Sequence, residues 1–207
     1  MVFHRVMDTV FATWSHVAAL RTLQDSAQGL SGREIARLSG MNHRSCLKAL
    51  TTLEELGIVI RQRGGRDHLF SLNRDHMLVE QGIAPLLTLE RKVIRDFADL
   101  LSRQLGKLAE SIILFGSVAR KEETPASDVD ICVVVRTRVE KDKAQSIIHD
   151  IAGKVQKRYG ARISPLLLTL QEFSSKARRK EPPIREIIKE GLILRGRSIR
   201  ELSNAAQ

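Results

Sequence analysis

The sequence of 207 residues predicts a mixed α/β (α+β) protein with two folded parts and a long helix between them. Three observations carry this prediction. Residues 31–72 have the pattern of two short helices and a strand hairpin, residues 84–108 repeat apolar side chains at helical spacing, and residues 111–135 contain two strand-like runs. We therefore expect domains at 1–75 and 111–207, with a linking helix at 76–110.

The first part begins with two helices around a glycine turn. Ser31 and Glu34 have the spacing of a capping box, Gly40 lies in the turn, and Asn42 is a second N-cap candidate. Apolar residues then recur at helical spacing until Gly57 ends the second helix. We expect these apolar positions to be core: Ile35, Ala36 and Leu38 in the first helix, and Leu47, Leu50, Leu53 and Leu56 in the second.

Two strand-like runs follow directly, residues 58–63 and 68–72, around a glycine-rich turn. A further helix is predicted near residues 13–23. Two helices, a tight glycine turn and a hairpin, with Leu53-Glu-Glu-Leu-Gly-Ile-Val59 leading into the hairpin, resemble the winged helix-turn-helix domain of prokaryotic transcription regulators. The resemblance covers about residues 8–74.

This resemblance implies that the domain binds double-stranded DNA. The second helix of such domains enters the major groove through its N-terminal residues, and hairpin arginines meet phosphates or the minor groove. Independently, 34 basic against 24 acidic residues, a formal charge of +10, favour polyanionic partners. The alternative is a protein-contact module whose arginines are only solvated. The implied DNA-binding residues are Asn42, His43, Arg44, Ser45 and Lys48 in the helix and Arg61, Arg63 and Arg66 in the hairpin.

Residues 84–108 predict one long helix, with Pro85 near its start. We expect it to pack on both domains or on a second copy of itself. Because winged-helix proteins commonly pair on DNA, a homodimer is consistent with this helix. Its apolar side comprises Leu86, Leu89, Val93, Phe97, Leu100, Leu101 and Leu105.

The most informative pattern for chemistry is the pair Asp128 and Asp130. A strand-like run at residues 111–115 ends in Gly116-Ser117, and the two acids open the next strand-like run. Residues two apart in a strand point to the same face, so the two carboxylates project together. Such hard oxygen ligands suit Mg²⁺, and a glycine turn lets backbone N–H groups approach a phosphate. Together these parts predict a site for a metal-bound nucleoside triphosphate.

Gly116-Ser117 and the later Asp128-Val-Asp130 resemble the signature of the DNA polymerase beta superfamily of nucleotidyltransferases, in particular its minimal bacterial and archaeal branch. The resemblance covers about residues 88–196, including a closing strand at 190–194. It implies a mixed sheet with flanking helices that binds Mg²⁺ and a nucleoside triphosphate, with ATP the nucleotide expected. The implied catalytic and metal-binding residues are Asp128 and Asp130, and the implied nucleotide contacts are Gly116, Ser117, Arg120 and Lys121.

One departure from the family concerns catalysis. Members that catalyse usually carry a third carboxylate on a later strand, which completes a site for two metal ions. Here residues 161–170 have the pattern of that strand, yet Ser164 occupies the expected position and no acid is present. Two carboxylates still suffice for the metal that accompanies the triphosphate. Glu172 either reaches back to the site or starts the next helix.

Three classes of function are open on these residues. The first is a nucleotidyltransferase that moves a nucleoside monophosphate from Mg²⁺-NTP to a hydroxyl on a protein, a nucleic acid or a small molecule, with the winged helix as a targeting or autoregulatory arm. The others are a catalytically inactive nucleotide-sensing transcription regulator and an antitoxin-like interaction protein. No run of 18 apolar residues occurs and the N-terminus lacks the order of a signal peptide, so we expect a cytoplasmic protein. Cys46 and Cys132 lie far apart and the histidines lack ligand spacing, so no disulfide or zinc site is predicted.

Overall fold

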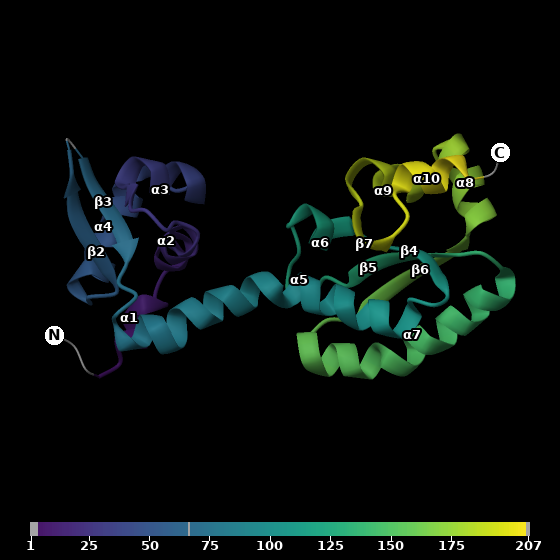
Figure 1. Ribbon diagram of the computed structural model, residues 1–207, viewed down its shortest axis with the longest axis horizontal. Helices are drawn as coiled ribbons and strands as arrows, with labels where there is room; N and C mark the ends of the chain where they lie inside the picture. The colour runs from purple at the N-terminus through teal and green to yellow at the C-terminus, as the bar shows by residue number, and fades with distance from the viewer. Residues whose placement is uncertain (1–3, 66, 206–207) are drawn as a thin grey trace. The chain divides into compact units, whose positions relative to one another are not determined.

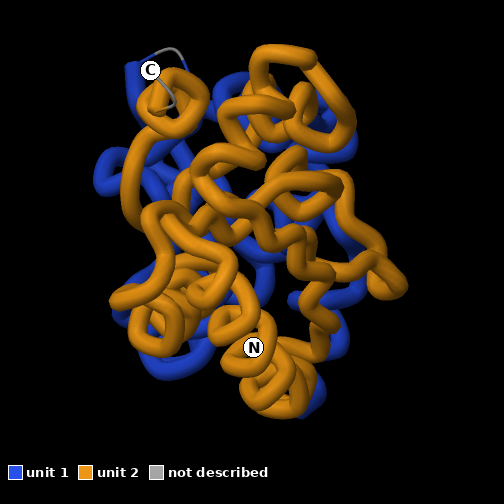
Figure 2. Tube along the Cα trace, turned by 90° about the vertical axis from the view of Figure 1, so that its right-hand side faces the viewer, with its two compact units in different colours: residues 1–91 blue, residues 92–207 orange. Residues whose placement is uncertain are grey.

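The structure is a computed structural model that describes residues 4–65 and 67–205 (Figure 1). It divides into two compact units, Met1–Arg91 and Lys92–Gln207 (Figure 2). The division falls within the long helix α5 (Ala84–Leu105), so each unit includes one end of that helix. Each unit also has a hydrophobic core made of its own residues.

The N-terminal unit contains the expected pair of helices and the hairpin. The capping box is confirmed, since Glu34 N donates to Ser31 Oγ at 3.3 Å and Ser31 N donates to Glu34 Oε2 at 2.9 Å. Asn42 Oδ1 caps the second helix by accepting from Arg44 N at 2.9 Å. The elements are α1 (Val6–Val10), α2 (Trp14–Gln24), β1 (Leu30–Ser31), α3 (Gly32–Ser39), α4 (His43–Glu55), β2 (Val59–Gly64), β3 (Asp67–Leu72) and the π-helix η1 (Val79–Ile83), with sheet order β1-β3-β2.

The core prediction is wrong for two leucines. Leu38 is 56% exposed and Leu47 is 38% exposed, whereas Leu50 and Leu53 are fully buried. The side of α3 that carries Ile35 and Ala36 is buried, and Leu38 lies outside that buried side. Strand β2 is shifted by one residue from the predicted range 58–63, and β3 begins one residue earlier than predicted, because Gly64 pairs with Asp67 across the turn.

The apolar side predicted for the long helix is only partly buried. Phe97, Leu101 and Leu105 lie in the core of the C-terminal unit, and the neighbouring position Leu87 lies in the N-terminal core. The buried residues of the predicted apolar side of α5 therefore all lie in the C-terminal core. The N-terminal core contains Leu87, which is not part of that predicted side. The helix ends three residues before the predicted end, where Gly106 follows. The residues of the predicted apolar side that are exposed are Leu86, Leu89 and Val93.

The C-terminal unit is a mixed four-stranded sheet of order β6-β5-β4-β7. Strands β4 and β5 pair antiparallel, β5 and β6 pair parallel, and β7 pairs antiparallel with β4. Helix α7 makes the connection between the parallel strands. The elements are β4 (Ala109–Phe115), α6 (Gly116–Arg120), β5 (Val129–Val135), α7 (Arg138–Tyr159), β6 (Ile163–Thr169), α8 (Leu170–Arg179), α9 (Ile184–Glu190), β7 (Leu192–Gly196) and α10 (Ile199–Asn204).

Helices cover both faces of this sheet (Figure 1). Alternate residues of each strand point to opposite faces. Ile112 and Leu114 therefore share a core with α5 and α7, while Ile113 belongs to the core formed with α8, α9 and α10. The closing strand begins two residues later than predicted, because α9 continues to Glu190. The predicted mixed α/β class is confirmed.

The two cysteines are buried and unpaired. Burial raises the pKa of the Cys132 thiol to about 12, so this thiol stays protonated at neutral pH. Among the described residues, no helix is both long enough and apolar enough to cross a bilayer.

Candidate functional site

The predicted glycine turn and aspartate pair meet at one edge of the C-terminal sheet. Strand β4 ends at Phe115, which pairs with Asp130 of β5, so Gly116 follows directly beside that aspartate. Gly116 has φ 73°, a left-handed conformation that favours glycine. A Cβ atom on Gly116 would lie 2.3 Å from Asp130 Oδ2 and 3.1 Å from its Cγ. The Asp130 carboxylate therefore occupies space that only a glycine leaves free.

Asp128 lies immediately before β5, at the same edge. Its Oδ1 accepts a hydrogen bond from Arg162 Nε at 3.0 Å, and the two side chains are 45% and 69% exposed. The backbone holds the two segments together, because Val129 N donates to Arg162 O at 2.8 Å. The two aspartates thus flank a single residue, Val129, which packs against the sheet core. Arg162 was not among the residues predicted from sequence.

Strand β6 brings Ser164 to this edge as expected. In the parallel pairing of β5 with β6, Ser164 is the partner of Asp130. The position beside Asp130 therefore carries a hydroxyl group and no charge. Among the described residues, no group of three or more His, Cys, Asp or Glu side chains is placed to hold a metal ion.

Glu172 belongs to a helix start and not to this site. Its Oε2 accepts from Thr169 N at 2.7 Å in the capping box of α8, and Lys141 Nζ lies 2.8 Å from the same oxygen. Burial alone would raise the pKa of Glu172, but the bonds from Lys141 and Thr169 outweigh it and lower that pKa. Thr169 pairs with Val135, five positions along β6 from Ser164, a separation of about 16 Å at the usual rise of a strand.

Of the predicted nucleotide contacts, Arg120 already has two partners. Its Nε lies 2.8 Å from Glu122 Oε2, and its Nη1 lies 2.8 Å from Glu190 Oε1. The bonds to Glu122 and Glu190 raise the pKa of Arg120. Lys121 is exposed and ends α6 in a left-handed conformation with φ 61°. Ser117 lies in the first turn of α6, next to Gly116.

The residues predicted to bind DNA lie mostly on the exposed side of α4 and on the hairpin. Cys46, Ala49 and Leu50 bury one side of α4, which leaves the predicted residues on the other side. Arg61 pairs with Glu54 at 3.1 Å. Arg66 lies outside the described residues. The predicted residues that the structure shows as exposed are Asn42, His43, Arg44, Ser45, Lys48, Arg61 and Arg63.

A hollow of about 330 Å³ in the N-terminal unit is lined by residues of α3, α4 and the hairpin. Leu47 lies in its wall, which explains why this leucine is not core. Its lining includes the cationic side chains of Arg33 and Arg61, two imidazoles, and the apolar side chains of Leu47 and Phe70. Its lining is Ser31, Gly32, Arg33, His43, Leu47, Thr51, Arg61, Asp67, His68 and Phe70.

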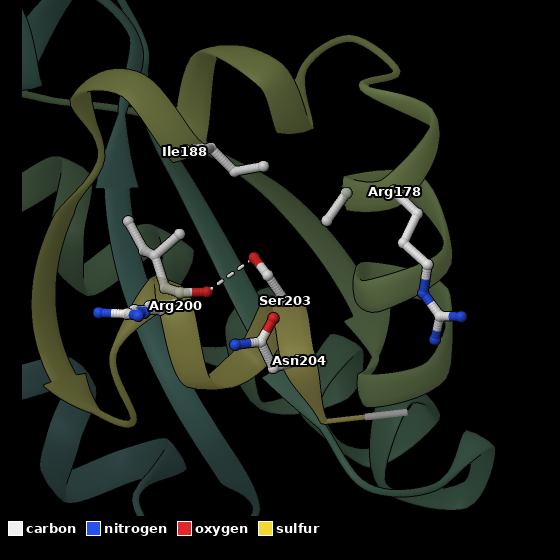
Figure 3. Close-up of a pocket in the computed structure, with 7 residues that line it drawn as sticks. Arg178, Ile188, Arg200, Ser203 and Asn204 are labelled. Carbon is white, nitrogen blue, oxygen red and sulfur yellow. Dashed lines mark hydrogen bonds between the residues drawn. The ribbon is translucent and has the colours of Figure 1, made fainter. Parts of the chain in front are cut away.

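A larger hollow of about 760 Å³ lies in the C-terminal unit among α8, α9 and α10 (Figure 3). Among the described residues, its lining includes none of the predicted nucleotide contacts, so size alone does not identify the site. Its lining is Ala177, Arg178, Ile188, Ile199, Arg200, Ser203 and Asn204.

The C-terminal unit therefore has the mixed α/β architecture of nucleotidyltransferase domains, with an aspartate pair and a glycine turn at one sheet edge. The family model described as a nucleotidyltransferase domain matches residues 92–194. The chain belongs to this nucleotidyltransferase family.

Two relatives are from Methanocaldococcus jannaschii, and both carry the name of a predicted protein adenylyltransferase. One, MJ1305, is 33% identical over 89 residues, which make up 41% of this chain and 58% of the relative. The other, MJ0604, is 31% identical over 87 residues, 42% of this chain and 81% of the relative. This chain thus spans little more than half the length of the first relative.

A solved structure described as a toxin-antitoxin with AMP-PNP is more distant. It is 16% identical to this protein, with a TM-score of 0.36. The aligned region covers 54% of this chain and 82% of the chain in that structure. A similarity at this level carries no argument about this protein.

Proposed function

We propose that the C-terminal unit binds a nucleoside triphosphate, preferably ATP, together with Mg²⁺. It then transfers the nucleoside monophosphate to a hydroxyl group of a protein, with the release of pyrophosphate and of the hydroxyl proton. The contact of the Asp130 carboxylate with Gly116 carries this proposal, because it joins the acidic pair to the glycine turn. Two carboxylates offer the hard oxygen ligands that Mg²⁺ prefers, so the residues present fit the metal ion.

Each residue at this edge then has a chemical role. Asp128 and Asp130 would hold the ion, which neutralises the phosphate charge when bound. Gly116 lets the Asp130 carboxylate lie against the turn, so that a metal ion held by Asp130 would be close to the backbone of the turn. Lys121 is exposed and offers a cation for the triphosphate, whereas Arg120 must leave Glu122 or Glu190 before it makes such a contact.

The names of the relatives support a protein as acceptor and AMP as the group transferred. Ser164 beside Asp130 leaves the unit with one carboxylate fewer than a two-metal site uses. We therefore expect transfer to be slow compared with nucleotide binding. If binding occurs with no transfer at all, the unit is a nucleotide sensor, which is the alternative that this serine favours.

The test is incubation with labelled ATP, GTP, CTP and UTP in the presence of Mg²⁺ or Mn²⁺, with binding and transfer scored separately. Asp128→Asn is expected to abolish metal-dependent binding. Asp150→Asn, on the exposed side of α7, is the matched control and is expected to bind as the wild type does. Equal, metal-independent binding by all three proteins would show that the aspartate pair is not the site.

For the N-terminal unit we propose a winged helix-turn-helix that binds double-stranded DNA. The exposed side of α4 next to the basic hairpin supports this proposal, since Arg44, Lys48 and Arg63 all lie on the surface. Selection from a random duplex pool tests it. The decisive quantity is the ratio of specific to non-specific affinity, because a basic protein retains any duplex at low salt. If no duplex is retained at about 100 mM salt, the unit is a protein-contact module.

A further inference from the structure

Arg162 is the cationic side chain that the structure bonds to the aspartate pair. Its Nε lies 3.0 Å from Asp128 Oδ1. Its position is fixed by the backbone, because Val129 N bonds to Arg162 O and the next residue along, Ile163, begins the pairing of β6 with β5. The contact therefore depends on strand register as well as on the reach of a flexible side chain.

The charges at this edge explain why a guanidinium is present. Two carboxylates that flank one residue repel each other when no cation is near. Arg162 neutralises one of them. Ser164, two residues further along the chain, contributes no charge, so the segment that leads into β6 brings a cation to the edge where a third carboxylate would bring an anion.

We propose that Arg162 is an exchangeable counter-ion of this site: it holds Asp128 in the metal-free protein, leaves when a divalent cation binds, and then contacts the phosphates of the bound nucleotide. This inference rests on the proposed nucleotide site and assigns the site a residue. Once a divalent cation is bound, the guanidinium is repelled by it and attracted by the triphosphate. Arg162 thereby supplies positive charge that a second metal ion supplies in a site with three carboxylates.

The consequence is that Arg162 has opposite effects on the affinity for a metal ion alone and on the affinity for a metal ion with a nucleotide. It competes with a metal ion that binds alone, and it favours a metal ion that arrives with a nucleotide. The ion pair is exposed, so the competition is modest, on the order of two- to fivefold in affinity, and it weakens as salt is added. A side chain with a purely structural role would change both affinities in the same direction.

The experiment measures Mn²⁺ binding by electron paramagnetic resonance, without nucleotide and with ATP. Arg162→Ala is expected to bind Mn²⁺ alone about two- to fivefold more tightly than the wild type and to gain less from added ATP. Arg136→Ala is the matched control, since Arg136 follows the other end of β5, is 71% exposed and pairs with Glu110 at 2.6 Å. This control is expected to match the wild type in both measurements.

Two further variants separate the possible failures. Arg162→Gln keeps much of the side-chain bulk but removes the charge, and it is expected to bind Mn²⁺ alone as tightly as Arg162→Ala does, which excludes a packing effect. If Asp128→Asn weakens Mn²⁺ binding but Arg162→Ala leaves it unchanged, the metal site stands and the exchange is wrong. If Asp128→Asn has no effect on Mn²⁺ binding, either in the wild type or in combination with Arg162→Ala, the proposed metal site is wrong and the proposed exchange is wrong with it.

Discussion

The contact between Gly116 and Asp130 can be tested by adding one methyl group. Gly116→Ala places a residue other than glycine at φ 73° and places its Cβ 2.3 Å from Asp130 Oδ2. The left-handed backbone costs about 1 to 2 kcal/mol in a residue that has a Cβ. The close approach adds a second effect, because the carboxylate must rotate away from the turn. We therefore expect both a loss of stability and a loss of metal affinity.

Two other glycines of the same unit separate these effects. Gly160, at the end of α7, has φ 68°, and a Cβ atom added there would meet nothing within 4 Å, so Gly160→Ala meets the backbone cost alone. Gly153, inside α7, has no unusual φ and the same open space, so Gly153→Ala is expected to be neutral or to stabilise by up to about 1 kcal/mol. Only Gly116→Ala is expected to change Mn²⁺ binding.

The assay follows the single tyrosine, Tyr159, which lies in the C-terminal unit, while the single tryptophan, Trp14, lies in the N-terminal unit. Denaturation followed by tyrosine circular dichroism therefore reports the unit that carries the substitutions. Gly116→Ala is expected to lower the free energy of unfolding by at least the loss seen for Gly160→Ala. If it is less destabilising than Gly160→Ala and keeps the Mn²⁺ affinity of the wild type, the reasoning about the carboxylate contact is refuted.

Three further predictions concern other parts of the molecule. Ser164→Asp is expected to raise Mn²⁺ affinity and transferase turnover at matched nucleotide occupancy, and a fall in both would show that this position is not the missing acid. Glu172→Gln is expected to cost about 1 kcal/mol at pH 7 in chemical denaturation. The pKa of Glu172 is lowered in the folded state, so its carboxylate contributes to stability at pH values above its ordinary pKa. This contribution is lost as the pH falls through the folded-state pKa, so the stabilities of wild type and mutant should converge in acid. In DNA-binding titrations, Arg63→Ala is expected to weaken binding to all duplexes and reduce the salt slope by about one unit, whereas Arg44→Ala should cost roughly 1 to 3 kcal/mol mainly on the preferred sequence.

The features that sequence predicted well are local ones. Ser31 and Glu34 form their capping box, Asn42 caps the next helix, and the hairpin forms around its glycine turn, because each depends on residues a few positions apart. The mixed class of the C-terminal unit was also predictable, since strand and helix periodicities alternate along it. The same local logic resolves Glu172: a Thr-x-x-Glu spacing at the start of a helix is a capping box, and the structure shows one.

The features that sequence missed depend on tertiary contacts. Hydrophobic periodicity predicts one continuous apolar side for α5, but it does not show which part of that side each unit buries. Leu89 fits the periodicity and is nevertheless 62% exposed. Leu47 has the spacing of a core residue, yet it lines a hollow because its neighbours across that hollow are hairpin residues far along the chain.

Arg162 shows why the candidate site was only half predictable. Its partner Asp128 lies 34 residues earlier, on the far side of α7, so no short-range spacing connects them. Once β5 and β6 are known to be parallel, the pairing of Asp130 with Ser164 places residue 162 beside residue 128. The serine at position 164 and the guanidinium of Arg162 then come from one segment, which consists of the start of β6 and the residue before it. Compared with a site that has a third carboxylate, both make the charge at the aspartate pair more positive. Under the proposal made for Arg162, one divalent ion rather than two would balance a nucleotide at this site, which is why Arg162 and not Glu172 is the residue to test beside the aspartates.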